Sequence, residues 1–187
     1  MNTALVVAAH PDDEVLGCGA TISLLSGEGW EVHVLIVAEG ATSRSAKRDL
    51  SQYKDELSSL AKCAEIPNSI LGTVSIELES LPDNRMDGIE LLDLVKLVET
   101  EIDIYKPCLI FTHHAGDVNI DHRVLHDSVI AACRPQPQHS VTVYYFLKCR
   151  QAQNGVQRPP ACISHQTIFT MRQIIYQKNR SITCIWG

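Results

Sequence analysis

The stretch NTALVVAAHPDDEVLGCGATI, residues 2–22, decides the fold because it joins an apolar run directly to a dense charged cluster. The run Ala4–Ala9 has the length of a strand, and an uninterrupted apolar strand is typical of a parallel sheet that is covered on both faces. One histidine and three acids follow it within five residues, at His10, Asp12, Asp13 and Glu14. A solvated turn would account for one of these acids, but not easily for the whole cluster.

Further apolar runs and helical patterns extend this beginning into a fold. Additional strands are predicted at residues 31–37, 108–112 and 141–147. Helices are predicted at residues 19–28, 45–64, 89–105 and 122–133. The alternation predicts an α/β fold, with a doubly wound, Rossmann-like, mostly parallel sheet and helices on both faces. Functional loops of such sheets gather at the carboxyl ends of the strands, where the charged cluster lies.

Length and composition exclude several classes of protein. The chain has 187 residues, 45% of them apolar and 20% charged, which suits one soluble domain with a core. The net charge of −6 argues against a nucleic-acid partner. No segment has the apolar length of a membrane span, and a signal peptide is not apparent, so we expect a cytoplasmic location. The seven cysteines form no CxxC pair, which argues against a cysteine-type zinc site.

The spacing of His10 and Asp13 suits metal binding. A tight turn that enters a helix can aim both side chains at one point, and Pro11 stiffens the turn by restricting His10 to an extended backbone. Imidazole nitrogen and carboxylate oxygen are both good zinc ligands. From the spacing alone, a solvated turn is an equal alternative, and a catalytic site needs a third ligand.

A second charged segment supplies candidates for the third ligand. The stretch THHAGDVNIDHRVLH, residues 112–126, follows a predicted strand. Its metal-binding residue types are His113, His114, His122, His126, Asp117 and Asp121. We favour His122 because it begins a predicted helix, which places it at the same carboxyl edge of the sheet as His10 and Asp13.

A metal at this edge would need a proton acceptor beside it. A zinc ion held by His10, Asp13 and His122 would lower the pKa of its bound water and polarise a carbonyl group. A carboxylate that does not bind the metal then takes the proton from that water. Asp12 is the first candidate, since it is adjacent to a ligand but points differently. Glu14 is the alternative, unless it caps the following helix.

Two motifs together resemble a known family. The first is AHPDDE with GCGAT behind it, at residues 9–14 and 17–21, and the second is GDVNIDH at residues 116–122. They are similar to motifs of the PIG-L/LmbE-type zinc-dependent N-acetylglucosaminyl deacetylases. A sugar-acting subgroup of that family is resembled by EGATSR (39–44), LPDNRMD (81–87) and YKPCLIFTHHAGDVNIDHRV (105–124). The resemblance covers residues 3–147.

The resemblance implies a metal-dependent N-deacetylase with Zn²⁺ as cofactor. Its zinc ligands would be His10, Asp13 and His122, and Asp12 would be the general base. Its partner would be a small molecule, an N-acetylglucosamine-like sugar or conjugate that loses its acetyl group to metal-activated water. Many relatives carry a histidine three residues before the last ligand, where this chain has Asn119. Since asparagine cannot act as an imidazolium acid, protonation of the leaving amine falls to Asp12 or to another group.

The resemblance also assigns roles around the substrate. Arg44, Asp83 and Asn119 are expected to contact it, although Arg44 is equally suited to a surface ion pair. Asp121 is expected to orient a ligand histidine rather than to touch the sugar.

The last part of the chain departs from the family. Residues 148–187 have little clear periodicity and would make a poor core. Their possible codons, read with an offset of two bases, allow peptides similar to three family segments in one constant frame, the first of them PSSTEW. We therefore predict a deacetylase domain at residues 1–147 and a frameshifted, poorly ordered tail at residues 148–187. A divergent C-terminus is the alternative.

Other functions stay open at this point. An amidase that acts on a thiol-sugar conjugate is not separated from a deacetylase by the sequence. A non-catalytic metal-binding α/β domain, inactivated by loss of its C-terminal part, is the alternative from another class. A nucleotide-binding domain is disfavoured because GCGATI lacks a third glycine and the preceding acids would repel a pyrophosphate. The sequence leaves homo-oligomerisation open.

Overall fold

The structure of the chain, a computed structural model, describes residues 2–135, 141 and 143–147. Within these residues five strands form one parallel sheet in the order β3-β2-β1-β4-β5. The strands are β1 (Thr3–Ala8), β2 (Glu31–Ala38), β3 (Ser75–Leu81), β4 (Leu109–His113) and β5 (Val143–Leu147).

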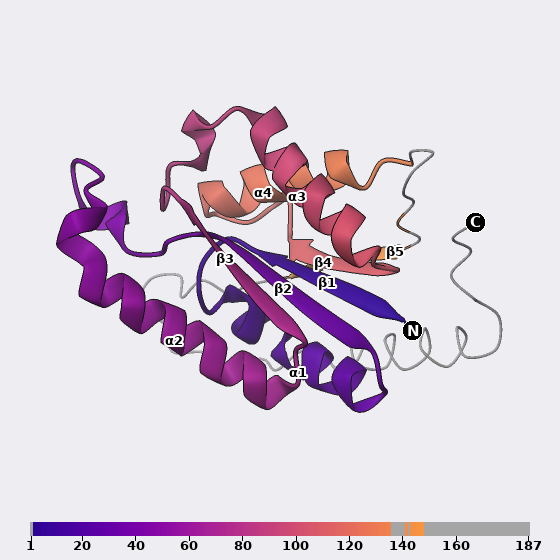
Figure 1. The fold of residues 1–187 in the computed structure, drawn as a ribbon. Coiled ribbons are helices and arrows are strands. Elements are labelled where there is room, and N and C mark those ends of the chain that lie inside the picture. The colour runs from indigo at the N-terminus through magenta and orange to yellow at the C-terminus, as the bar shows by residue number, and fades with distance from the viewer. Residues whose placement is uncertain (1, 136–140, 142, 148–187) are drawn as a thin grey trace, which may run out of the picture. The chain divides into compact units, whose positions relative to one another are not determined.

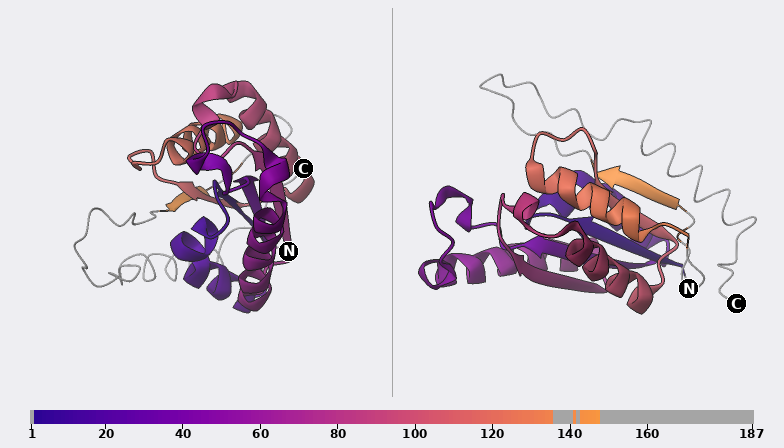
Figure 2. Two further views of the ribbon diagram at one scale, coloured as in Figure 1. Left: turned by 90° about the vertical axis from the view of Figure 1, so that its left-hand side faces the viewer. Right: turned by 90° about the horizontal axis from the view of Figure 1, so that it is seen from above.

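Four α-helices of the described residues connect the strands and cover both faces of the sheet. They are α1 (Asp13–Gly27), α2 (Lys54–Leu71), α3 (Leu91–Tyr105) and α4 (Ile120–Ala132). Short 3₁₀ turns lie at η1 (Thr42–Arg44), η2 (Leu50–Tyr53) and η3 (Met86–Gly88). α1 and α2 lie on one face, and α3 and α4 lie on the other (Figures 1 and 2). The predicted doubly wound α/β fold is confirmed.

The direction of winding reverses beside β1. The chain runs from β1 outward through β2 to β3, then returns to β4 on the other side of β1 and continues to β5. Val6 of β1 is therefore paired with both Val34 of β2 and Phe111 of β4. Ligands of open α/β sheets bind at such a reversal, outside the carboxyl ends of the strands. The loops after β1 and β4 leave the sheet at this place.

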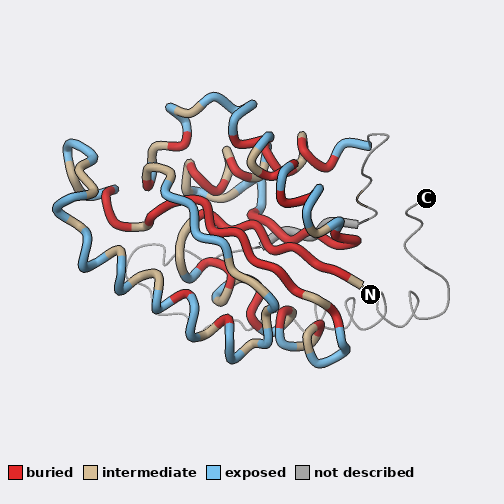
Figure 3. The backbone as a smooth tube through the Cα atoms, viewed as in Figure 1, coloured by how far each residue is buried: buried red, intermediate tan, exposed pale blue. Residues whose placement is uncertain are grey.

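The central strands form the core, as their continuous apolar sequences predict. β1 is buried along its whole length (Figure 3). Leu5 and Val7 belong to one buried cluster with Val98 of α3 and Leu125 of α4. This packing fixes the ends of β1 and β4 and so gives the loops above them a rigid base.

The structure differs from the sequence-based expectation in three elements. β3 was not predicted, because it is an edge strand whose Glu77 and Glu79 are exposed, so it lacks a continuous apolar run. α1 begins at Asp13 rather than at Gly19. α2 begins later than predicted and continues to Leu71.

The described residues belong to one compact unit, Met1–Cys149. The predicted tail, residues 148–187, lies outside the described residues, so its order and its reading frame stay predictions. Among the described residues, no helix has the length and apolar character needed to cross a membrane.

Candidate metal centre

The turn between β1 and α1 presents two of the predicted ligands, and its own hydrogen bonds hold them together. The amide of Asp13 donates to the carbonyl oxygen of His10 over 3.2 Å. The amide of His10 donates to Asp13 Oδ2 over 3.0 Å, and the ring atom His10 Nδ1 lies 3.2 Å from the same oxygen. One carboxylate oxygen of Asp13 is thereby fixed beside the imidazole of His10.

The first turn of α4 adds the third predicted ligand. His122 is 2% exposed, and its Nε2 lies 3.1 Å from Asp13 Oδ2 and 3.4 Å from His10 Nδ1. His10 and His122 are 112 positions apart in the chain. They meet because β1 and β4 are neighbours in the sheet.

The three donor atoms form a nearly equilateral triangle with edges of 3.1, 3.2 and 3.4 Å. Two ligand atoms that each lie about 2.0–2.1 Å from a tetrahedral zinc ion are about 3.3 Å apart. His10, Asp13 and His122 therefore fit one divalent cation. Three protein ligands of nitrogen and oxygen are the set found in catalytic zinc sites, which keep a fourth position for water or substrate.

Each of these histidines has a carboxylate on its other ring nitrogen. His10 Nε2 lies 3.1 Å from Asp121 Oδ2 and 3.2 Å from Asp83 Oδ1. His122 Nδ1 lies 3.2 Å from Asp117 Oδ2. Carboxylates in this position fix the tautomer and the orientation of a metal-binding histidine and raise its basicity.

The surrounding carboxylates favour positive charge at the triangle. Burial alone would lower the pKa of His10, but hydrogen bonds to three carboxylates, the largest from Asp121, outweigh burial and raise the pKa to about 11. Burial of His122 is likewise outweighed by its hydrogen bond to Asp13, so its pKa is raised. Burial opposes ionisation of Asp13, yet the two imidazoles hold its pKa well below the usual range. The rings of His10 and His122 thus hold protons beside the Asp13 carboxylate, and a metal ion bound there would displace these protons.

Asp12 lies between the first two ligands with a strained backbone. Its φ of 116° and ψ of −26° fall in the left-handed region. A residue with a Cβ rarely adopts this region, at a cost of about 1–3 kcal/mol. Asp12 is exposed, while partial burial raises the pKa of its carboxyl group and the charge of Asp13 raises it further. Asp12 is therefore a carboxylate beside the ligands that accepts a proton more readily than a free aspartate.

Glu14, the alternative proton acceptor, points into the protein. It is 0% exposed, and its Oε1 accepts a hydrogen bond from Asn68 Nδ2 over 2.8 Å. Its Oε2 accepts one from the amide of Asp12 over 3.1 Å. Of the two acids considered as a base, only Asp12 reaches solvent.

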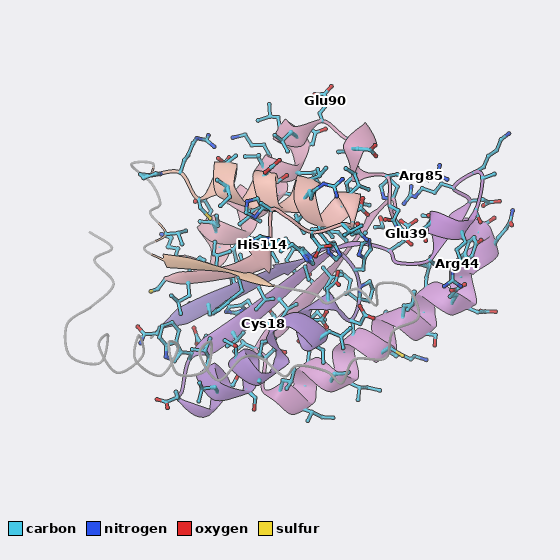
Figure 4. The ribbon with its side chains drawn as sticks, turned by 180° about the vertical axis from the view of Figure 1, so that it is seen from behind. Cys18, Glu39, Arg44, Arg85, Glu90 and His114 are labelled. Carbon is cyan, nitrogen blue, oxygen red and sulfur yellow. The ribbon has the colours of Figure 1, made fainter. Side chains whose placement is uncertain are left out.

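Arg44 and Asp83, two of the three residues predicted to contact the sugar, differ in exposure. Arg44 ends η1 and is exposed, and Figure 4 shows it on the same side of the molecule as Glu39. Asp83 is 4% exposed, and besides facing His10 it accepts a hydrogen bond from the amide of Ser43 over 3.3 Å. Asp83 thus links η1 to the candidate ligand His10, while a direct substrate contact stays a prediction for both residues.

Asn119 and Asp121 make contacts within the protein. Asn119 is the N-cap of α4, and its Oδ1 accepts a hydrogen bond from the amide of Asp121 over 2.8 Å. Asp121 is 0% exposed, and its two carboxylate oxygens accept hydrogen bonds from the amides of Asn84 (2.6 Å) and Met86 (3.0 Å). Asp121 therefore holds the loop after β3 against His10, an arrangement suited to orienting that ligand.

The sequence assigned no orienting role to His113 or Asp117. His113 is 0% exposed, stacks on His122 with ring centroids 3.8 Å apart, and accepts a hydrogen bond from the amide of Ala9 over 2.8 Å. Burial, with the nearby His122, lowers the pKa of His113 to about 3, so this neutral ring joins the end of β1 to β4. Spacing marked both residues only as candidate ligands, because it does not show which neighbours their side chains face in the fold.

The fold and the site together define a class, a Rossmann-like α/β protein with a His-Asp-His candidate metal centre at the reversal of the sheet. The sequence model of the PIG-L family, described as GlcNAc-PI de-N-acetylase, matches residues 5–133. The match covers more than half of the chain, and the chain belongs to this family of deacetylases, as its motifs predicted.

Two proteins that are similar to this chain are described as deacetylases. The uncharacterized deacetylase YaiS of Escherichia coli K12 is 23% identical over 135 residues, which are 72% of this chain and 69% of YaiS. The N,N'-diacetylchitobiose deacetylase from Pyrococcus horikoshii is similar in structure, with a TM-score of 0.61, 20% identity and coverage of 99% of this chain and 73% of that one.

One structural neighbour catalyses a different reaction. GalB, the 4-carboxy-2-hydroxymuconate hydratase from Pseudomonas putida KT2440, has a TM-score of 0.66 and 20% identity, and the match covers 100% of this chain and 92% of GalB. At such identities both solved structures show the shared fold. The reaction must therefore be argued from the site.

Proposed function

We propose that the chain is a zinc-dependent hydrolase that removes the acetyl group from an N-acetylglucosamine-like sugar or conjugate. The observation that supports this most directly is the triangle of donor atoms from His10, Asp13 and His122. Asp12 is exposed, and the charges of all three residues act on its carboxyl group. Membership of the PIG-L family supports the deacetylase class.

In this proposal each residue of the site has one task. His10, Asp13 and His122 hold the zinc ion, which when bound lowers the pKa of water and polarises the acetyl carbonyl. Asp12 accepts a proton from the attacking water as the water oxygen bonds to the amide carbon. The carbon–nitrogen bond then breaks, and Asp12 returns the proton to the leaving nitrogen. The products are acetic acid and a free amine, which at neutral pH become acetate and an ammonium group.

Asn119 enters this proposal as a hydrogen-bond donor. Its Oδ1 already accepts a hydrogen bond from the amide of Asp121 in the cap of α4. In this proposal the Nδ2 group of Asn119 donates a hydrogen bond to the substrate oxygen that becomes negative during the reaction.

Metal analysis of the purified protein tests the ligand set. We expect about one zinc per chain, lost in His10→Ala, because that variant removes one corner of the triangle. If another divalent metal is found at the same stoichiometry, the ligand set is supported and the assignment of zinc is wrong. Glu65→Ala, an exposed acid of α2, is the control that should keep the metal.

Acetate release from N-acetylglucosamine derivatives tests the reaction. We expect Asp12→Asn to lower the rate by roughly 10²–10⁴-fold with its zinc retained, since the variant keeps the shape of the side chain and removes the base. Release of an amine from a thiol-sugar conjugate alone would favour the amidase alternative. Zinc bound without turnover of any sugar amide would contradict the proposal and favour a non-catalytic domain.

We also propose that residues 148–187 are read out of the family frame, because their possible codons, offset by two bases, allow three family-like peptides in one frame. The coding DNA around codon 148 decides the question: a peptide like PSSTEW in the neighbouring frame is expected, and its absence contradicts the frameshift. Restoring that frame should raise the acetate rate of the chain if the family's C-terminal segment contributes to the site.

A further inference from the structure

We propose that Glu14 and Asn68 are positioning residues that hold the backbone of Asp12 and thereby aim its carboxylate at the candidate metal centre. The catalytic consequence of this inference rests on the proposed function, whereas its geometric part does not. Asn68 lies on α2, 54 positions from Glu14 in the chain. The inference therefore assigns α2 a part in the site, although none of the candidate ligands lies on that helix.

The first observation is the backbone of Asp12. Three residues other than glycine have a positive φ among the described residues: Asp12 at 116°, Asn84 at 55° and Lys106 at 45°. The values for Asn84 and Lys106 are close to the ordinary left-handed conformation near +57°. Asp12 is far from it, and such a conformation persists only where surrounding contacts enforce it.

The second observation is the contact that enforces it. The amide of Asp12 donates to Glu14 Oε2 over 3.1 Å, and its carbonyl oxygen accepts the amide of Leu16 over 2.9 Å as α1 begins. Both polar groups of the Asp12 backbone are thus bound. The carbonyl contact belongs to any helix start, whereas the amide contact exists only because a carboxylate follows two residues later.

The third observation is the buried amide that fixes this carboxylate. Asn68 is 0% exposed, and its Nδ2 donates both to Glu14 Oε1 over 2.8 Å and to the carbonyl oxygen of Ala64 over 2.9 Å. A buried carboxylate is costly unless it is hydrogen-bonded, and Asn68 supplies the bond on the side away from Asp12. The two donor hydrogens of Asn68 leave its amide group a single orientation.

The amide oxygen of Asn68, which has no hydrogen-bond partner among the described residues, indicates why an asparagine is present. Its Oδ1 is buried and makes no hydrogen bond with any part of the chain that the structure describes. A buried acceptor without a partner is destabilising, so packing alone would favour an apolar side chain at this place. The donor function toward Glu14 is the gain that explains the polar residue.

The decisive experiment separates positioning from mere stability. Asn68→Leu removes the donor while keeping a similar volume. We expect it to leave the zinc content unchanged and to lower kcat by about 10–100-fold with little change in KM, because a small misplacement of a reacting group has effects of this size. In the Asp12→Asn background the same substitution should change the residual rate by less than about twofold. A full further loss in that background would overturn the inference.

Two more variants sharpen the result. The pair Glu14→Gln and Asn68→Asp exchanges donor and acceptor, so the introduced amide can still accept from Asp12 and donate to the introduced carboxylate. We expect this pair to recover part of the activity that Asn68→Leu loses, because the carboxylate introduced at residue 68 restores the bond to residue 14 but also faces the carbonyl oxygen of Ala64. Leu25→Ala, at the far end of α1, removes a buried side chain and is the stability control. An equal fall in kcat for Leu25→Ala at the same loss of unfolding midpoint would contradict positioning.

Hydrogen exchange measures the geometry without any substrate. By NMR the Asp12 amide should be protected in the wild-type chain and exchange at least about tenfold faster in Asn68→Leu and Glu14→Ala, with the amides at the far end of α1 unchanged. An unchanged Asp12 amide overturns the inference. If the wild-type chain releases no acetate, the proposed function fails, and this measurement still decides whether Glu14 and Asn68 hold Asp12.

Discussion

The turn between β1 and α1 holds its two candidate ligands together by local hydrogen bonds, whereas the loop between β4 and α4 supplies a single candidate ligand whose position depends on the sheet. His10 and Asp13 contact each other across three residues. His122 reaches them only because β4 lies beside β1. The first turn is therefore a local unit whose geometry follows from spacing, and the second is positioned by topology.

The carboxylates that contact the two histidines show the opposite pattern of local and distant contacts. His122, the ligand positioned by topology, is contacted by Asp117 of its own loop. His10, the ligand in the local turn, is contacted by Asp83 and by Asp121, which precedes His122 directly in the chain. The histidine of the local turn thus depends on the β4–α4 segment, and the site is one unit rather than two independent halves.

The largest effect is expected from the residue that the two loops share. Asp13→Ala removes the oxygen that faces both imidazoles, so zinc should fall from about one to near zero per chain, with a loss of acetate release of more than about 100-fold, beyond the range for an outer carboxylate. Elemental analysis and an acetate assay measure this. Asp93→Ala, an exposed aspartate of α3, should change neither. Zinc retained by Asp13→Ala would contradict the shared ligand.

A smaller effect is expected from the outer carboxylates. Asp121→Asn and Asp117→Asn should each weaken zinc binding by about 10–100-fold, measured by competition with a chelator. The loss should be larger for Asp121, because its carboxylate also accepts the amides of Asn84 and Met86. A larger loss of zinc affinity in Asp117→Asn than in Asp121→Asn would contradict this order. It would mean that His122 depends on its outer carboxylate more than His10 does.

The smallest effect is expected from the cap of α4. Asn119→Ala should lower the free energy of unfolding by about 1 kcal/mol, measured in denaturant, because the helix loses its N-cap. Asp49→Ala removes the corresponding cap of η2, away from the site, and serves as the control. If Asn119→Ala lowers acetate release more than Asp49→Ala does at the same loss of stability, a substrate contact is supported. If the two variants lower acetate release equally, a substrate contact is contradicted.

The central fold was predictable because its strands are continuous apolar runs. Ala4–Ala9 and the run at 31–37 could be recognised as buried strands by composition alone. β3 escaped because an edge strand needs no apolar face, and its Glu77 and Glu79 are exposed. α2 passes through Pro67, which normally indicates the end of a helix, so its last turn and Asn68 were not anticipated.

The ligand triangle could be anticipated and its support could not. The parallel topology brings the carboxyl ends of β1 and β4 to one edge, so His10, Asp13 and His122 were expected to be neighbours. The contact of Asp117 with His122 depends on the path of an irregular loop. The contact of Asn68 with Glu14 depends on how two helices lie side by side, and no spacing in the sequence encodes it.

The distance between His10 and His122 along the chain has a consequence for folding. An ion bound by both histidines would cross-link positions that are 112 apart in the chain, as a disulfide bond does. Chelators rather than reductants would remove this cross-link. Binding only to the folded chain stabilises it by about 4 kcal/mol when free metal is about 1,000 times the dissociation constant. When the ion is scarce, a smaller fraction of the molecules would be folded, and the folded molecules without the ion would have a lower catalytic rate.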